Sequence, residues 1–331
     1  MRLNKTYKQK IMREKDGLNN MEKQSINNIN ITGVLVSSTL AKKTLVDKVT
    51  SQPYEAISGE LVIRTSDGSE HEVSLFSKRL TKTGAESKMF ISYNTIMTEY
   101  KSLEKFPEEA DVISVNGAEF GVNDYKNKEG EVKTFTQING KFVNRVTLDK
   151  IETTPQTATF EIEGQVVTLA PETYKNEITG NGEIHIIAFG YGGTIIPVKL
   201  IVPKELAEGF GSAGFFETGM AKLTGNLINT KVSETIVEKQ SFGADLVKEV
   251  TTTVRRFEVK GGSPKGSIYD FGITDVELEQ AKTKRRLKLE EVKNKVATTG
   301  QQQGFTPQAT NQTSQFGQTN QSPTSNPFAK Q

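Results

Sequence analysis

The residue types that most often carry catalysis are scarce in this chain. It has 331 residues, no cysteine and only two histidines, His71 and His185, which fall in different predicted strand hairpins. The missing cysteines exclude thiol nucleophiles, disulfides and thiolate zinc sites. The sequence also lacks an H-E-x-x-H spacing and a G-x-x-x-x-G-K-[ST] phosphate loop, and its carboxylates are scattered. We therefore expect no enzyme activity, no metal and no cofactor.

Side chains that could bind an unpaired nucleic-acid strand are more frequent. Aromatic rings stack on bases, and lysine and arginine attract phosphates. The candidate nucleic-acid-binding residues combine these two kinds and lie along strands or in polar loops. They are Lys78, Arg79, Lys82, Lys88, Tyr93, Tyr125, Lys126, Lys128, Lys133, Phe135, Tyr191, Arg255 and Arg256.

Aromatic residues are equally suited to a hydrophobic core, and half or more of those in the chain are expected there. Tyr125 and Tyr191 stand in polar loops and are the least expected to be buried. Phe76, Phe90 and Phe120 are the most expected to be buried, because they stand in apolar strand or helix patterns.

The charge distribution limits the kind of nucleic-acid binding that is plausible. The formal net charge is only +2, and residues 1–28 hold seven Lys or Arg against three Asp or Glu, so the middle of the chain is slightly acidic. A protein that covers duplex DNA nonspecifically is normally cationic throughout. Binding would therefore use a local groove with a strong aromatic share. No apolar run approaches the roughly 20 residues that a membrane span needs.

The hydrophobic pattern places the candidates on short strands around one helix. Residues 37–59 read as a polar connection, and Asp67-Gly68 is a hairpin signal. The predicted elements are strands at 29–36, 60–65, 70–76, 112–120 and 132–138, with a helix at 89–103 before the fourth strand. Five strands with a helix before the fourth is the order of a small Greek-key barrel.

A fainter copy of this order follows. Its strands are predicted at 158–168, 182–189, 194–202, 220–228, 236–240 and 250–259, with a short helix from 203. Ordered similarity of this kind predicts tandem barrels. The alternative is one larger β-sandwich whose halves only look alike.

The chain is thus divided into five segments. They are a flexible basic lead-in at 1–24, a first barrel at 25–150, a second barrel at 151–262, a linker and charged helix at 263–297, and a disordered Gln/Asn-rich tail at 298–331. Thr274 and Glu277 form a capping box that predicts the start of the helix. A basic band along this helix is read as a solvated face in preference to a DNA contact. It consists of Lys282, Lys284, Arg285, Arg286 and Lys288. The tail holds too little apolar surface to become ordered.

With this strand order, the Lys/Asn/Gly hairpin at 123–130 and a tail ending near Asn326-Pro327-Phe328, the chain resembles the single-stranded DNA-binding proteins of the OB-fold group. It looks similar in particular to phage- or mobile-element-encoded members from low-GC Gram-positive hosts. The resemblance implies a mainly β fold with two tandem OB-like Greek-key barrels, a C-terminal helix and a disordered tail.

The resemblance also implies a function. It is sequence-tolerant binding of single-stranded DNA that protects replication or recombination intermediates in the cytoplasm, which is the host cytoplasm if the protein is phage-encoded. Family members bind DNA across strands two and three and the adjoining loops, which maps by position to Lys78, Arg79, Lys126 and Lys128. The alternative is a phage structural or protein-interaction module whose barrels bind no nucleic acid, and the slightly acidic middle favours it.

The tail departs from the family pattern. Bacterial members end in an acidic tip closing with Pro-Phe, which recruits partner enzymes. Here Pro327-Phe328 is followed by three more residues, and positions 297–331 contain no Asp or Glu. Replication or recombination proteins are candidate partners of the tail, but the missing acidic tip argues against the usual tip-binding partners. A homo-oligomer is left open, and no membrane association is expected.

Overall fold

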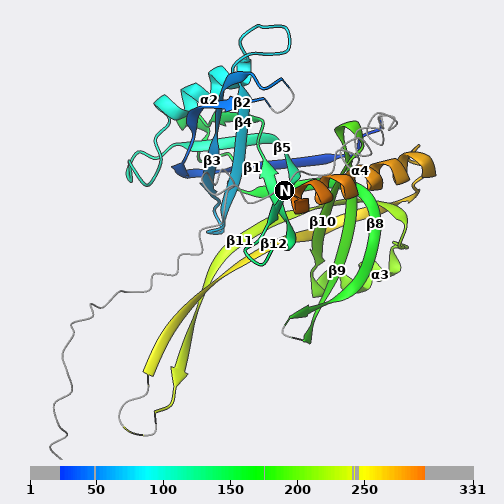
Figure 1. Ribbon diagram of the computed structural model, residues 1–331. Coiled ribbons are helices and arrows are strands. Elements are labelled where there is room, and N and C mark those ends of the chain that lie inside the picture. The colour runs from blue at the N-terminus through cyan, green and yellow to red at the C-terminus, as the bar shows by residue number, and fades with distance from the viewer. Residues whose placement is uncertain (1–22, 48–49, 175, 241, 243–245, 295–331) are drawn as a thin grey trace, which may run out of the picture. The chain divides into compact units, whose positions relative to one another are not determined.

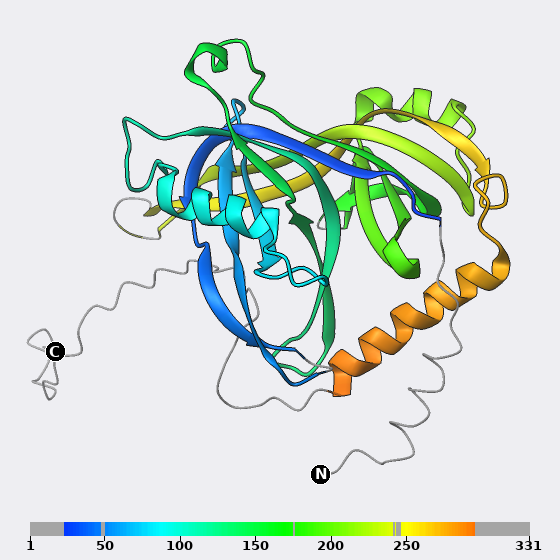
Figure 2. The ribbon, with the colours of Figure 1, turned by 90° about the horizontal axis from the view of Figure 1, so that it is seen from above.

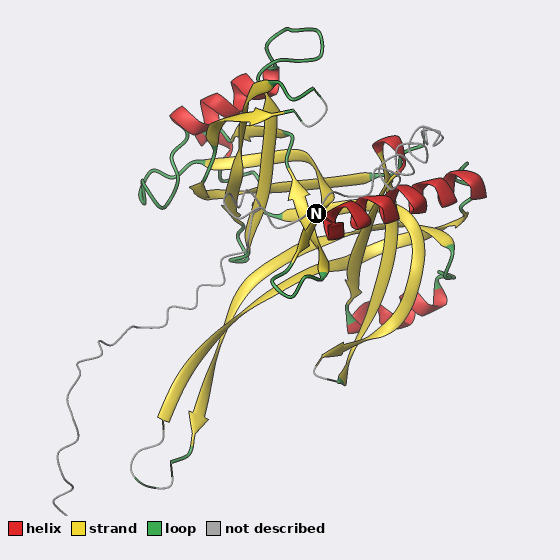
Figure 3. Ribbon diagram, viewed as in Figure 1, coloured by secondary structure: helices red, strands yellow, loops and turns green. Residues whose placement is uncertain are grey.

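The computed structural model describes residues 23–294 apart from 48–49, 175, 241 and 243–245. This part of the chain is mainly β, with twelve strands joined in one sheet and three α-helices (Figures 1 and 3). Most of the predicted lead-in and the whole of the predicted tail lie outside the described residues. Within the described part, no helix combines the length and apolar character needed to cross a membrane.

Five strands of the first half close into a ring, which we call barrel 1. Its elements are β1 (Asn27–Ser38), β2 (Ala41–Val46), β3 (Pro53–Arg64), β4 (Glu70–Lys78), α2 (Lys88–Glu99), β5 (Val112–Lys126), β6 (Val132–Asn139) and β7 (Phe142–Arg145). The ring runs β1-β3-β4-β6-β5 and closes from β5 back to β1, with only the β4–β6 pair parallel. This connectivity, with α2 between β4 and β5, is that of a five-stranded Greek-key OB barrel.

The second half repeats the same connectivity, and we call it barrel 2. Its elements are β8 (Ala158–Tyr174), β9 (Glu177–Gly190), β10 (Thr194–Val202), α3 (Lys204–Ser212), β11 (Gly219–Glu238) and β12 (Leu246–Ser267), with one-turn helices η1 (Leu148–Lys150) and η2 (Tyr191–Gly193). The ring runs β8-β9-β10-β12-β11 and closes from β11 to β8, again with one parallel pair, β10–β12. The tandem OB-like barrels predicted from the sequence are thus confirmed.

Alternation of apolar residues explains why these segments form barrel strands. In β1, Ile29, Ile31, Gly33 and Leu35 are buried and alternate with the less buried Asn30, Thr32 and Val34. At Gly33 a Cβ atom would lie 2.2 Å from the carbonyl oxygen of Arg64, so only glycine lets β1 pass this close to β3.

Two segments predicted as connections are strands. In the stretch read as a polar connection, β2 pairs with the first half of β3. As an edge strand, β2 leaves Lys42, Thr44 and Val46 exposed, so its composition resembles that of a loop. The linker predicted before the last helix is the end of β12. A Cβ atom at Gly262 would lie 2.5 Å from the carbonyl oxygen of Lys222, so this glycine serves close strand packing.

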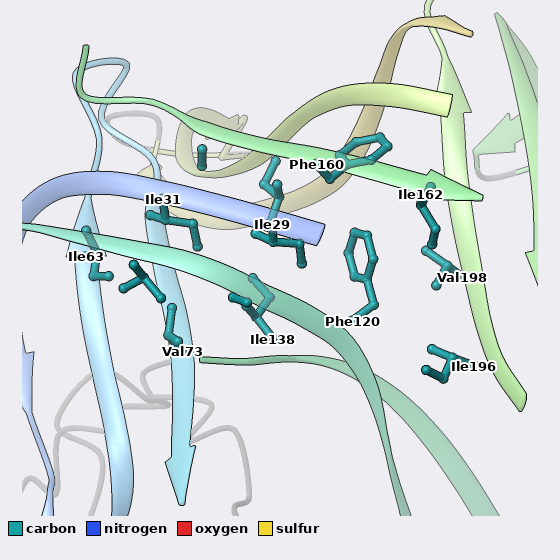
Figure 4. Close-up of a cluster of buried hydrophobic side chains, with 14 of the residues drawn as sticks. Ile29, Ile31, Ile63, Val73, Phe120, Ile138, Phe160, Ile162, Ile196 and Val198 are labelled. Carbon is teal, nitrogen blue, oxygen red and sulfur yellow. The ribbon is translucent and has the colours of Figure 1, made fainter. Parts of the chain in front are cut away.

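The two barrels share backbone pairing and core. The start of β1 pairs with the start of β8, from Asn27 opposite Ile162 to Ile31 opposite Ala158. Phe120 of β5 packs edge-on against Phe160 of β8, with ring centroids 5.8 Å apart. Figure 4 shows these two rings beside each other, between the isoleucines of β1 and the strands of barrel 2. One continuous hydrophobic cluster therefore crosses the junction.

The last helix, α4 (Asp275–Asn294), joins both barrels. The predicted capping box is present: Thr274 N donates to Glu277 Oε2 at 2.9 Å, and Glu277 N donates to Thr274 Oγ1 at 3.3 Å. Leu278 packs in a cluster with Ile195 of β10. The far end of α4 reaches the β5–β6 strands of barrel 1 (Figure 2).

Candidate nucleic-acid interface

Two of the predicted residues, Lys78 and Arg79, line a groove at the open end of the β3–β4 hairpin, opposite its turn. The groove has a volume of about 620 Å³ and is formed by the start of β3, the end of β4 and the loop before α2. Its lining residues are Pro53, Tyr54, Glu55, Lys78, Arg79, Leu80, Gly84 and Glu86. We call it the β3–β4 groove.

Local sequence explains why the loop beside the groove has a fixed path. Thr81 N donates to the carbonyl oxygen of Ala85 at 2.8 Å, and Gly84 between them has φ +83°. Ser87 then caps α2 by accepting from Phe90 N at 3.4 Å. The chain that follows Lys78 and Arg79 is therefore a closed turn, and this turn leads directly into the capped start of α2.

Strand register places aromatic and basic side chains on one outer face beside this groove. Ala56 is opposite Lys78 and Ser58 is opposite Phe76, and the alternation of β4 buries Leu75 while it exposes Phe76. Phe76 is 49% exposed, so the prediction that it is a core residue is wrong, whereas Phe90 and Phe120 are buried as predicted.

Tyr54 supplies the aromatic side of the groove and is absent from the residues predicted from the sequence. The Nζ atom of Lys78 lies 4.2 Å from the Tyr54 ring centroid, which is a cation–π contact. The same Nζ atom lies 3.2 Å from Asp47 Oδ2. The strand register could have identified Tyr54. It stands two residues before Ala56, which is opposite Lys78, so Tyr54 and Lys78 lie on the same face of the strand pair.

Carboxylates hold the arginine of the groove. Arg79 Nη1 lies 2.5 Å from Glu55 Oε2, and Arg79 Nε lies 3.3 Å from Glu86 Oε1. Glu55 first and Glu86 second raise the pKa of the Arg79 guanidinium above its ordinary value. A smaller hollow of about 310 Å³ shares these three residues, so their ion pairs form the ridge between two depressions. Lys82 and Lys88 are exposed on the loop and at the start of α2.

Tyr93 is not an interface residue, which corrects its selection. It lies on the inner face of α2, is fully buried, and donates its hydroxyl hydrogen to the carbonyl oxygen of Lys141 at 3.0 Å. Burial raises the pKa of Tyr93 to about 12. Helical spacing with Phe90 and Ile96, which are also buried, makes it a core residue.

The predicted residues on the β5–β6 hairpin lie apart from the lining of the β3–β4 groove. Tyr125 is exposed as predicted and is directly opposite Lys133, which is paired with Glu131 at 2.8 Å. Lys126 Nζ donates to the carbonyl oxygen of Lys293 in α4 at 3.2 Å. Lys128 is exposed in the turn.

Arg255 and Phe135 join the two barrels, and both side chains are half-buried, so their selection as binding residues stays a prediction. The Arg255 guanidinium carbon lies 4.6 Å from the Phe135 ring centroid, and Arg255 Nη2 donates to the carbonyl oxygen of Thr136 at 3.1 Å. Burial lowers the pKa of Arg255. The next residue, Arg256, is half-buried, and Tyr191 is 82% exposed in η2 of barrel 2.

These features define a protein of two OB-type barrels with a groove beside Tyr54, where β3 begins and β4 ends in the first barrel. The chain belongs to the YorF family, whose model matches residues 24–295. No curated protein matches the chain.

Solved structures with a similar arrangement include two of the single-stranded DNA-binding protein from Thermus aquaticus. The wild-type structure has 11% identity over 73% of this chain and 93% of that chain, with a TM-score of 0.40. A deletion mutant of the same Thermus protein has 13% identity over 73% of this chain and 95% of that chain, with a TM-score of 0.39. A replication protein A heterotrimer bound to single-stranded DNA has 12% identity over 73% of this chain and 51% of that chain, with a TM-score of 0.20. At these values, our assignment of the OB topology rests on the strand pairings described above.

Proposed function

We propose that this protein binds single-stranded DNA with little sequence preference, without catalysis, through the β3–β4 groove. The observation that carries the proposal is the placement of Tyr54, Phe76 and Lys78 on the outer face of the two central strands of barrel 1. This is the face on which OB barrels take up oligonucleotides. The half-buried Tyr54 ring and the exposed Phe76 ring there can stack unpaired bases, while the exposed Lys82 attracts the backbone.

Several finer statements belong to the same proposal. Protection of replication or recombination intermediates, a phage or mobile-element origin, and a boundary between the barrels at 150/151 are inferences from the family resemblance and strand order. Binding of replication or recombination proteins by positions 298–331 stays a prediction, because these residues lie outside the described part of the chain.

The test removes the ring that lines the groove and the exposed ring beside it, in a Tyr54→Ala/Phe76→Ala variant. Fluorescence anisotropy with labelled oligo(dT) should show affinity reduced at least about tenfold, because each stacked base contributes roughly 1–3 kcal/mol. Phe142→Ala is the matched control, since Phe142 is also an exposed ring of barrel 1 but lies on β7. An unchanged affinity in the double variant, or equal affinity of the wild type for duplex, would count against the proposal.

A protein-interaction module is the second candidate function. The pairing of Lys78 and Arg79 with carboxylates favours it, because it leaves the lining of the groove without a cationic excess. Capture of a protein partner from cell extract by the wild type, lost in Tyr54→Ala/Phe76→Ala, together with no binding to any oligonucleotide, would select this function.

A further inference from the structure

The cations lining the β3–β4 groove each face a carboxylate. Lys78 Nζ lies 3.2 Å from Asp47, and Arg79 lies 2.5 Å from Glu55 and 3.3 Å from Glu86. Glu55 and Glu86 belong to the groove lining itself, and about half of each side chain is exposed to solvent. A ligand that enters the groove therefore meets negative charge beside every lining cation.

This arrangement affects phosphates and bases in opposite ways. A phosphate must displace a carboxylate from Lys78 or Arg79 and lie near the charge that it displaced, which is unfavourable. A nucleobase is uncharged, stacks on an aromatic face and can donate its N–H groups to a carboxylate. The groove thus disfavours a ligand that presents backbone first and accepts one that presents bases first.

Duplex and single strands differ in this respect. A duplex keeps its bases stacked and paired inside two phosphate backbones, whereas a single strand can turn its bases outward. We propose that Glu55 and Glu86, with Asp47 in support, are specificity-determining residues that make the groove reject duplex DNA. This inference rests on the proposed function, because it assumes that the β3–β4 groove is where the strand binds.

The test neutralises the two lining carboxylates without changing their size, in a Glu55→Gln/Glu86→Gln variant. The matched control is Glu109→Gln/Glu119→Gln, which changes net charge equally and breaks two exposed ion pairs of barrel 1, those with Lys101 and Lys141, outside the groove lining. Affinities for labelled oligo(dT) and for a duplex of equal length are measured by anisotropy over a series of salt concentrations. Thermal unfolding checks that both variants are folded.

We expect the groove variant to bind duplex roughly tenfold more tightly than the wild type does, with a much smaller gain for oligo(dT). The slope of log K against log salt for duplex should become steeper by about one. The two substitutions free Arg79, whereas Lys78 keeps Asp47, and each freed cation that neutralises a phosphate adds about 0.9. The control variant should change the affinities for oligo(dT) and for duplex by the same factor, and this factor should be smaller than the gain for duplex in the groove variant.

The two proposals fail in different ways. If Tyr54→Ala/Phe76→Ala weakens oligo(dT) binding but Glu55→Gln/Glu86→Gln leaves duplex affinity unchanged or lower, the carboxylates do not set specificity and the proposed function stands. A gain for duplex that the control variant matches also overturns the inference, because it reflects net charge alone. If the wild type binds neither ligand, both proposals fall.

Discussion

At the scale of single residues, Tyr93 shows how a buried hydroxyl constrains the core of barrel 1. The ring is fully buried and the hydroxyl donates to the carbonyl oxygen of Lys141. In Tyr93→Phe that carbonyl loses its donor, and we expect the free energy of unfolding to fall by about 1 kcal/mol. Urea denaturation measures this change. Affinity for oligo(dT) should not change, and a loss of binding at unchanged stability would return Tyr93 to the interface.

His71 makes the stability of the protein depend on pH. It is buried in β4, and burial lowers its pKa from 6.5 to about 4, a shift that nearby Asp67 opposes and Arg255 reinforces. Between these values the unfolded chain binds a proton that the folded chain does not. We therefore expect the contribution of His71 to be complete above about pH 6.5 and to be lost as pH falls towards 4, at a cost of about 3 kcal/mol.

Chemical denaturation at a series of pH values between 5 and 6.5 checks this prediction about His71. The carboxylates whose pKa values are lowered, such as Asp67 and Asp124, lose their contributions at lower pH. Burial raises the pKa of Glu60, which changes stability in the opposite direction as pH falls, so the His71 variant is needed to assign the loss to the histidine. His71→Gln should make the free energy of unfolding nearly flat there. A flat wild-type profile, or a slope that persists in His71→Gln, would contradict the assignment.

At the scale of elements, the attachment of α4 to barrel 1 depends on one buried carboxylate. Asp124 has a side-chain exposure of 1%, accepts two hydrogen bonds from Arg285 at 2.5 and 2.7 Å, and lies 3.4 Å from Lys288. Arg285 is 13% exposed. Burial by itself would raise the pKa of Asp124, but the hydrogen bonds from Arg285 and Thr134 and the charges of Arg285 and Lys288 together lower it.

Asp124→Asn should therefore release α4 from the β5–β6 hairpin. It leaves Arg285 with no anionic partner in a largely buried site, and removing one member of such a pair typically costs about 3–5 kcal/mol. Hydrogen exchange of α4 amides should rise most. Arg286→Gln is the control, because Arg286 pairs with Glu290 on the exposed face of the same helix. Equal exchange in the two variants would mean that Asp124 does not anchor the helix.

The same elements show what the sequence can and cannot predict. Asp67-Gly68 and the Thr274–Glu277 capping box are local signals, and both mark the elements they predict. The hydrogen bond from Arg285 to Asp124 joins residues that are 161 positions apart in the chain. A local pattern cannot show such a contact, so the basic band is predicted from the sequence to be a solvated face. Within the site, Lys78 and Arg79 stand out by composition, whereas Tyr54 becomes visible only when register pairs β3 with β4.

At the scale of the whole described molecule, the two barrels are joined by several independent contacts. β1 pairs with β8 along the backbone, Phe120 packs on Phe160 and Phe257, and Arg255 reaches from barrel 2 to Thr136 of barrel 1. Asn229 N also donates to Ser69 Oγ at 3.2 Å. Neither barrel can open at this junction without exposing core that belongs to the other.

We therefore expect residues 23–294 to unfold in one cooperative transition, with equal calorimetric and van't Hoff enthalpies. Phe160→Ala at the junction should lower its midpoint, since truncating a buried phenylalanine costs about 3–5 kcal/mol. Ile96→Ala, in α2 of barrel 1 alone, should shift the same single transition because barrel 2 cannot stay folded without its neighbour. Two resolved transitions, with Ile96→Ala moving only one of them, would show that the barrels fold independently. The junction would then be a docking contact between separate domains, and a bound strand would meet two platforms of variable spacing instead of one fixed surface.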